Sequence, residues 1–252
     1  MMISPALTDR LWKTIRTEYL DQLDRSITEN NLFNGTYCKK AEDSIKQLTQ
    51  RKHCVFTSSG THAILMSLIA IGIKPGDEII CANLSHPASC NQVSVLGAIP
   101  VFVDVEKHGH LNTDQIESKI TSATRAIIPV GLYGENFEYQ AIQDIAGRHN
   151  LTILEDSAQS YGTMYNTLPA GKLGHVSVLS FSRNKPAMTP FGGGALVTDS
   201  EKIAQIARLV STHGKQKRHN CIETLGINAQ AKEDRAIAVN IALEHMRKWN
   251  QK

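Results

Sequence analysis

Four short stretches of the 252-residue chain carry residue types that could do chemistry, and each stretch borders a run of apolar residues. In open α/β sheets, ligands bind beyond the carboxyl ends of the strands, so side chains at such places are candidates for a site. The first stretch, SSGT at 58–61, is a glycine-containing turn that opens a helical pattern. Its backbone N–H groups and hydroxyls suit an anion such as phosphate, or serve as ordinary helix caps.

Two adjacent acids, Glu155 and Asp156, end the second apolar run, LTIL. A carboxylate aimed into a crevice can hydrogen-bond a protonated ring nitrogen and keep it charged, because an opposite charge nearby favours ionisation. The alternative interpretation is a pair of acids that caps the next helix.

The third stretch places Lys185 after the apolar run HVSVL, in the segment SFSRNK. A lysine whose amine is kept neutral by its neighbours condenses with an aldehyde to a Schiff base, whereas most single lysines are solvated surface charges. The fourth stretch, the glycines at 192–194, permits close backbone approach or forms a flexible turn.

The segments around these stretches alternate between strand and helix patterns. Strands are predicted for HCVFTS, EIICA, PVFVDV, RAIIPV, LTILED, HVSVLSF and GGALVTD. Helices are predicted over 7–29, 37–50, 61–73, 114–120, 137–149, 201–211 and 231–249, with a further one through Val93 and Leu96. Strands that are apolar throughout and separated by helices indicate a mainly parallel sheet covered on both faces. The predicted fold class is therefore α/β with a seven-stranded sheet.

Composition is that of an ordinary globular chain, with 41% hydrophobic and 20% charged residues and a net charge of +3. The basic residues are scattered, so nothing indicates nucleic-acid binding. The densest basic stretch, comprising Lys215, Lys217, Arg218 and His219, is either a solvated loop or an anion contact for a phosphorylated substrate.

Cysteine spacing and hydropathy predict neither a metal site nor a membrane segment. Cys38, Cys54, Cys81, Cys90 and Cys221 form no CxxC pair and have no histidine at zinc-ligand spacing, so reduced thiols are expected. The sequence has no apolar signal core and no stretch of 18 apolar residues, which predicts a cytoplasmic location.

Taken in order, the motifs resemble the DegT/DnrJ/EryC1/StrS family of sugar aminotransferases, a branch of the fold-type I enzymes that use pyridoxal 5′-phosphate (PLP). The matching pieces are SSGTHA (58–63), GIKPGDEII (72–80), GAIPVFVDV (97–105), RAIIPVGLYG (125–134), LEDSAQSYG (154–162), SFSRNK (180–185), GGGALVTD (192–199), STHG (211–214) and GIN (226–228). The resemblance runs from about Asn34 to Asn228 and implies the large PLP-binding domain of this fold.

The resemblance implies a role for each matched position. Lys185 corresponds to the lysine that holds the cofactor and shuttles a proton, and Asp156 corresponds to the acid that pairs with the pyridine nitrogen. Gln159 is then expected near the cofactor's phenolic oxygen. His86 is expected to stack on the cofactor ring, with a simple helix cap as the alternative.

Phosphate binding is assigned by the same resemblance to Gly60, Thr61 and Ser180. Asn228 is expected to reach the phosphate of the neighbouring subunit, because the family builds two active sites across a symmetric homodimer. The chain departs from the family at Gln230, where an arginine is usual, and at Pro186, where asparagine is common.

Length is the larger departure, since family members are typically about half as long again. The predicted division is a helical segment (1–33), the PLP-binding α/β domain (34–214), and a loop and helix that lead into a truncated C-terminal domain (215–252). A truncated gene product, a trimmed chain and a compact member completed by a partner all fit this pattern.

The leading functional hypothesis is transfer of an amino group from L-glutamate to a keto group of a nucleotide-linked deoxysugar. Cell-surface polysaccharide or secondary-metabolite synthesis is the implied setting. The alternatives are an aminotransferase acting on a keto-cyclitol, a truncated non-catalytic remnant or partner subunit that binds PLP or a sugar nucleotide, and a plain scaffold that binds no cofactor. Lys185 argues against the family's dehydratases, in which histidine replaces the lysine.

Overall fold

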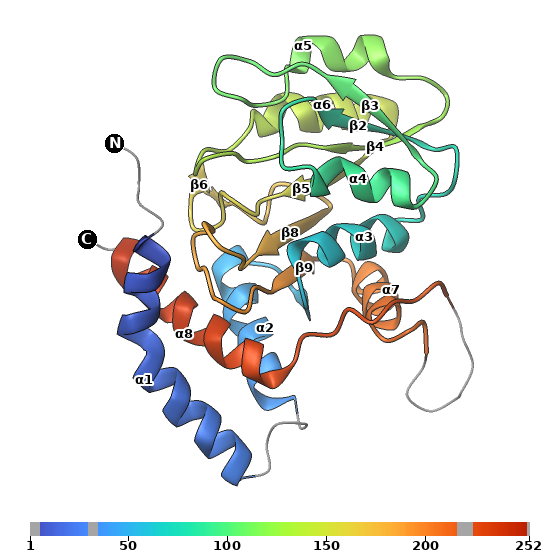
Figure 1. Cartoon of the computed structure of the whole chain (residues 1–252). Helices are drawn as coiled ribbons and strands as arrows, with labels where there is room; N and C mark the ends of the chain where they lie inside the picture. Colours follow the sequence, from blue (N-terminus) through green and yellow to red (C-terminus); the bar gives the residue numbers. More distant parts are fainter. Residues whose placement is uncertain (1–5, 30–34, 216–223, 251–252) are drawn as a thin grey trace.

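The apolar runs of the sequence form one seven-stranded sheet, of order β1-β9-β8-β5-β4-β2-β3 (Figure 1). The computed structural model describes residues 6–29, 35–215 and 224–250. The strands are β1 (His53–Thr57), β2 (Glu78–Ala82), β3 (Ile99–Val103), β4 (Thr124–Ile128), β5 (Thr152–Asp156), β8 (Val176–Ser180) and β9 (Gly194–Thr198). All pairings are parallel except those of β9, which runs antiparallel to both β1 and β8. The predicted fold class and all seven predicted strands are confirmed.

Helices cover both faces of the sheet. They are α1 (Ala6–Thr28), α2 (Thr36–Thr49), α3 (Gly60–Ala70), α4 (Ala88–Val95), α5 (Thr113–Ile116), α6 (Tyr139–His149), α7 (Glu201–Ser211) and α8 (Glu233–Asn250). One face packs against α3, α4 and α7. The opposite face packs against α2 and α8 near β1, and against α5 and α6 near β4. Burial on both faces explains why the strands are apolar throughout.

Two local predictions need correction. The helix predicted over 114–120 is the short α5 followed by a 3-10 turn (Glu117–Lys119), because the backbone at Ile120 is already extended toward β4. A small hairpin, β6 (Met164–Tyr165) and β7 (Leu168–Pro169), follows β5, where no strand was predicted.

Helix α8 lies between α1 and α2 (Figure 1). Ile237 and Ile241 on α8 pack with Ile15 of α1, while Met246 packs in the cluster that contains Ile45 of α2. Residues 236–243 of α8 are buried on every side of the helix, and its packing against α1 and α2 accounts for this burial. The domain boundaries predicted at 33 and 214 stay predictions.

Several predictions concern residues at the margins of the described chain. Lys217, Arg218, His219 and Cys221 lie outside the described residues, while Lys215 is exposed.

The four described cysteines are free thiols. Among the described residues, no helix is both long and apolar enough to cross a membrane.

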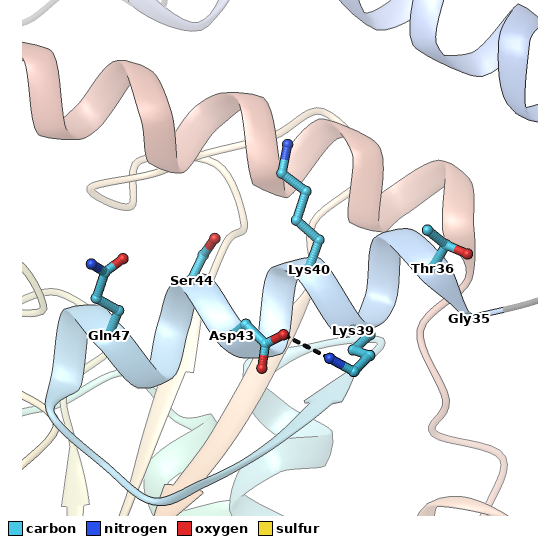
Figure 2. A pocket seen from close by; sticks show the side chains of 7 residues that line it. All are labelled: Gly35, Thr36, Lys39, Lys40, Asp43, Ser44 and Gln47. Carbon is cyan, nitrogen blue, oxygen red and sulfur yellow. Dashed lines mark hydrogen bonds and ion pairs between the residues drawn. The ribbon is translucent and has the colours of Figure 1, made fainter.

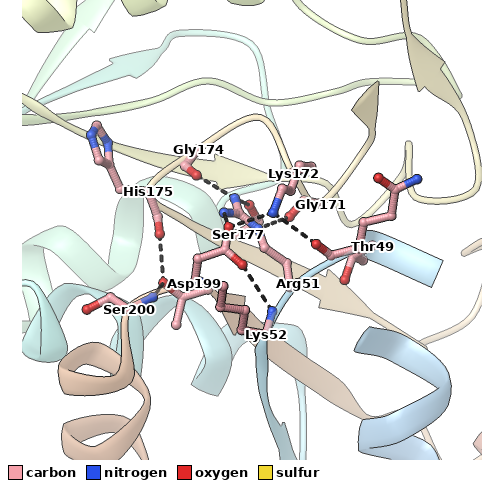
Figure 3. A network of polar contacts seen from close by, with 12 residues as sticks. Thr49, Arg51, Lys52, Gly171, Lys172, Gly174, His175, Ser177, Asp199 and Ser200 are labelled. Carbon is pink, nitrogen blue, oxygen red and sulfur yellow. Dashed lines mark hydrogen bonds and ion pairs between the residues drawn. The ribbon is translucent and has the colours of Figure 1, made fainter. Parts of the chain in front are cut away.

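A buried polar network joins the first strand to the middle of the sheet (Figure 3). Arg51 precedes β1 and is only 8% exposed. Its Nε donates to the carbonyl of Gly171 (2.8 Å), and its Nη1 donates to Asp199 Oδ2 (3.0 Å). Its Nη2 donates to the carbonyl of Gly174 and to Ser177 Oγ. The guanidinium therefore ties together the segments around β8 and β9.

Glu155 completes this network from the end of β5. Its fully buried carboxylate accepts hydrogen bonds from Ser177 Oγ (2.6 Å) and from the N–H groups of Gly171 (2.7 Å) and Leu173 (2.8 Å). Burial raises the pKa of Glu155, although these hydrogen bonds and the charge of Arg51 act in the opposite direction. The first of the two adjacent acids thus stabilises the fold instead of serving a site.

We predict that Arg51→Ala lowers the free energy of unfolding by about 3–5 kcal/mol, because it leaves buried acceptors without their donor. Urea denaturation followed by circular dichroism measures this change. Arg148→Ala is the matched control, since Arg148 pairs with Glu117 at 55% side-chain exposure and its loss should cost less than about 1 kcal/mol. Equal losses in the two variants would show that the buried network contributes no more to the free energy of unfolding than an exposed ion pair.

Candidate active site

A cavity of about 260 Å³ lies at the carboxyl edge of the sheet. Seven of the eight predicted site residues line it, namely Gly60, Thr61, His86, Asp156, Gln159, Ser180 and Lys185. They come from the ends of β1, β2, β5 and β8, which are distant in sequence and adjacent or near in the sheet. The site prediction placed these residues at strand ends, and the fold brings them together there.

The reversed strand β9 explains why the lysine segment lies over this edge. Gly194, the first residue of β9, pairs with Thr57 at the end of β1 and with Ser180 at the end of β8. The connection over 181–193 therefore leaves and re-enters the sheet at the same edge. A Cβ on Gly194 would lie 2.2 Å from the carbonyl carbon of Ser59, so only glycine fits where the two segments meet.

The anion end of the cavity is the start of α3. Ser59 caps this helix, its Oγ accepting from the N–H of His62 at 3.1 Å. Facing it, the hydroxyls of Ser180 and Ser182 lie 3.0 Å apart. A Cβ on Gly60 would lie 2.8 Å from Ser180 Cβ, which shows how closely the helix start approaches β8. Free N–H groups at a helix start and two hydroxyls form a cradle suited to phosphate.

Asp156 lies at the floor of the cavity with an exposed fraction of 4%. Its Oδ2 accepts from Ser89 Oγ (2.7 Å), and its Oδ1 accepts from the N–H of Ala158 (3.1 Å). The two bonds fix the carboxylate in one orientation. Its adjacent partner, Glu155, bonds away from the cavity, so a single acid serves the site.

Lys185 is half-buried on the wall of the same cavity. Burial lowers the pKa of its ammonium group below the ordinary value, while the charge of Asp156 acts in the opposite direction. A lowered pKa increases the neutral, nucleophilic fraction of the amine at a given pH. The environment of Lys185 therefore favours the neutral amine that Schiff-base formation needs.

The segment that carries Lys185 is held by Tyr161, a fully buried side chain. The Tyr161 hydroxyl donates to the carbonyl of Ser180 (3.0 Å) and accepts from the N–H of Ala187 (2.8 Å). One phenol thereby fixes both ends of the lysine turn. Asn184 adopts a positive φ of 67°, a conformation that asparagine tolerates.

His86 and Gln159 occupy the outer part of the cavity. The exposed ring of His86 lines the cavity, and its Nδ1 also accepts from the N–H of Ala88 (3.3 Å) at the start of α4. The geometry is thus compatible both with stacking of His86 on a cofactor ring and with a helix cap. Gln159 Oε1 accepts from the N–H of Tyr133 at 3.4 Å.

Asn228 does not line the cavity. It is exposed, and its backbone forms a bridge with Thr212. The next residue, Ala229, accepts a hydrogen bond from the N–H of Ser58, so this segment supports the anion end from outside. The contact of Asn228 with a partner subunit's phosphate stays a prediction, as does the consequence of the exposed Gln230.

Comparison with known proteins agrees with the geometry. The model of the DegT/DnrJ/EryC1/StrS aminotransferase family matches residues 13–252. The chain belongs to this family. PLP is the cofactor of its aminotransferases.

Curated relatives of this family member include three proteins of 31–32% identity. A Geobacillus stearothermophilus "pleiotropic regulatory protein" is 32% identical over 95% of the chain and 64% of the relative. The UDP-2-acetamido-2-deoxy-3-oxo-D-glucuronate aminotransferase of Pseudomonas aeruginosa is 32% identical over 82% of the chain and 58% of its own length. The 3-oxo-glucose-6-phosphate:glutamate aminotransferase of Bacillus subtilis is 31% identical over 91% and 51%. The chain thus spans 51–64% of these relatives.

Solved structures of the family superpose closely on the chain. A family aminotransferase from Brucella abortus gives a TM-score of 0.92 at 28% identity, covering 98% of this chain and 68% of that one. NtdA from Bacillus subtilis, solved with bound cofactor PMP, gives 0.88 at 30% identity and covers 99% and 57%.

The cavity residues of the DegT/DnrJ/EryC1/StrS family member fit PLP. The cradle at Gly60 and Ser180 is too tight for an added Cβ and is lined by hydroxyls. The buried carboxylate of Asp156 suits a protonated ring nitrogen, and the amine of Lys185 suits an aldehyde.

Ser89, Tyr161 and Phe191 belong to the site but were not predicted from sequence. Ser89 orients Asp156, Tyr161 holds the lysine turn, and Phe191 lines the cavity. Tyr161 lies within the motif LEDSAQSYG, so the motif was a signal for it. Serine and phenylalanine are common residue types, and nothing in their spacing distinguishes these two.

A second, shallow hollow lies along the exposed side of α2 (Figure 2). It is lined by Gly35, Thr36, Lys39, Lys40, Asp43, Ser44 and Gln47. Its one carboxylate, Asp43, already forms ion pairs with Lys39 (3.0 Å) and Lys46 (2.7 Å). The residues that line this hollow combine no nucleophile with a base, so the cavity at the sheet edge is the candidate active site.

Gly60→Ala tests the tight contact at the anion end. We predict a loss of about 1–3 kcal/mol in the free energy of unfolding, because the new methyl group must displace Ser180 or the start of α3. Gly147→Ala is the control, since Gly147 lies in α6 with no heavy atom within 4 Å of an added Cβ. That variant should gain about 0.5–1 kcal/mol. A neutral Gly60→Ala would show that the contact is loose.

Asp156→Asn tests the electrostatic coupling between the acid and the lysine. Removing the carboxylate charge leaves burial unopposed, so the pKa of Lys185 should fall further. Labelling of Lys185 by an amine-reactive reagent, followed by mass spectrometry across a pH series, should reach its midpoint at a lower pH. Asp144→Asn on the exposed side of α6 should leave the midpoint unchanged. An upward shift in Asp156→Asn would refute the coupling.

Proposed function

We propose that this chain binds PLP and transfers an amino group from L-glutamate to a keto group of a nucleotide-linked deoxysugar. One observation carries the proposal. A half-buried lysine of lowered pKa, a buried carboxylate and a tight hydroxyl-lined cradle converge on one cavity. These are the three kinds of group that PLP chemistry requires of a protein.

Lys185, Asp156 and the cradle would each have a separate role in this reaction. PLP, when bound, supplies the electron sink that makes proton removal from the amino-bearing carbon feasible. The amine of Lys185 accepts and returns that proton, which is general acid-base catalysis by an amine whose pKa is already lowered. Asp156, fixed by Ser89, keeps the ring nitrogen protonated, and the cradle at Gly60 and Ser180 holds the phosphate.

The substrate assignment rests on the relatives. The name of the Pseudomonas aeruginosa relative gives a UDP-linked 3-oxo sugar acid, and the name of the Bacillus subtilis relative gives 3-oxo-glucose-6-phosphate and glutamate. Both names give a keto sugar, which favours a keto sugar over a keto-cyclitol, and the first of them gives a nucleotide-linked one. Because the chain spans only 58% and 51% of these relatives, their activities are carried here only as a proposal.

We further propose a cytoplasmic homodimer with shared sites, acting in polysaccharide or secondary-metabolite sugar synthesis. The exposed position of Asn228, next to a segment that supports the anion end, is compatible with a contact across such a dimer. Family resemblance supports the setting.

The test is the absorption spectrum of the full chain with added PLP, recorded before and after L-glutamate. Wild type should develop a long-wavelength band that glutamate bleaches, and Lys185→Ala should develop none. Lys172→Ala is the matched control, because Lys172 pairs with Asp199 away from the cavity. A Lys185-dependent band that glutamate leaves unchanged would favour a non-catalytic PLP-binding protein. Absence of the band in wild type would refute cofactor binding.

A further inference from the structure

Arg235 is a cation behind the anion end of the cavity, and it contacts residues that line the cavity without lining it itself. It lies near the start of α8 and is half-buried. Its Nη1 donates to the carbonyl of Ser58 at 2.8 Å. Ser58 lines the cavity and immediately precedes the cap of α3.

The side chain of Arg235 also approaches the other wall of the cavity. A Cβ on Gly193 would lie 3.6 Å from Arg235 Cδ, and Gly193 lines the cavity as well. Arg235 therefore lies against the turn that begins α3 and the turn that begins β9. The first of these turns belongs to the anion end, and the second contacts it where Gly194 meets the Ser59 backbone.

The charge of Arg235 has no counter-ion within the described part of the chain. No described carboxylate lies within ion-pair distance of its guanidinium, whereas Arg51, Arg148 and Arg208 each pair with an acid. A half-buried cation without a counter-ion is costly, and an anion placed nearby offsets that cost.

The pKa of His62 shows that the charge of Arg235 acts on the start of α3. His62 Nδ1 lies 2.6 Å from Ser58 Oγ, in the first turn of α3. Burial lowers the pKa of His62, and the positive charge of Arg235 lowers it further. The start of α3 thus experiences the field of Arg235.

We propose that Arg235 is a positioning residue for phosphate: its charge attracts the phosphate group of the cofactor to the cradle, and its hydrogen bond holds the Ser58 turn in place. The proposal rests on the cofactor binding of the proposed function. It also makes α8 part of the binding site, since the cation comes from that helix. A purely structural role, in which Arg235 only clamps the Ser58 carbonyl, is the alternative.

The experiment compares PLP with pyridoxal, which has the same aldehyde and ring but no phosphate. Dissociation constants for both aldehydes are measured from absorbance titrations of the full chain in wild type, Arg235→Gln and Arg235→Lys. Arg247→Gln is the matched control, because Arg247 lies on the same helix and also donates to a backbone carbonyl, that of Ser44.

Arg235→Gln should weaken PLP binding about tenfold at low salt, the size expected for one partly screened charge, and change pyridoxal binding by less than about twofold. Arg235→Lys should retain most of the PLP affinity, because it keeps the charge, and Arg247→Gln should match wild type. Equal weakening of both aldehydes, or equal losses in the Gln and Lys variants, would assign Arg235 a clamp role and overturn the proposal.

A thermal-stability titration with inorganic phosphate separates this proposal from the proposed function. Phosphate should raise the melting temperature of wild type and of Arg247→Gln more than that of Arg235→Gln. If wild type bound neither aldehyde, the proposed function would fail, and this titration alone would decide the role of Arg235. Identical phosphate responses in Arg235→Gln and wild type would overturn it.

Discussion

The candidate site depends on one constraint of the sheet, the antiparallel insertion of β9 between β1 and β8. Because β9 begins where its two neighbours end, three chain segments meet at one edge. The contact between Gly194 and the Ser59 backbone is so close that no side chain fits there. That contact brings the start of α3 and the end of the lysine segment together at one edge of the sheet.

The pair of acids at the end of β5 shows how one short motif serves two purposes. Successive side chains of a strand point to opposite sides. Glu155 therefore joins the buried network around Arg51 on one side of the strand, while Asp156 faces the cavity on the other. The buried network orders the strand whose last residue must be placed accurately. Fold stability and site geometry are thus coupled through adjacent residues.

Sequence patterns predicted much of the fold, because burial on both faces leaves strands that are apolar throughout. They also indicated Lys185 and the pair Glu155 and Asp156, since ligand-binding side chains gather at the carboxyl ends of strands. The patterns did not distinguish which of the two acids faces the cavity. Ser89 escaped prediction because it is a common residue type whose role depends on a contact with a residue far along the chain. Motif order supplied the roles of Gln159 and Ser180, which their residue types alone do not indicate.

Helix α8 was recognised from sequence as a helix but not as part of the site, because its apolar residues suggested only packing. Its sides are buried against α1 and α2, which fixes the helix relative to the sheet. Its first turns consequently hold Arg235 against Ser58, at the anion end. The packing of a peripheral helix thereby determines where a positive charge lies beside the cavity. With the role proposed for Arg235, a substitution between α1 and α8 alters phosphate binding without contacting the cofactor, through the position of that single cation.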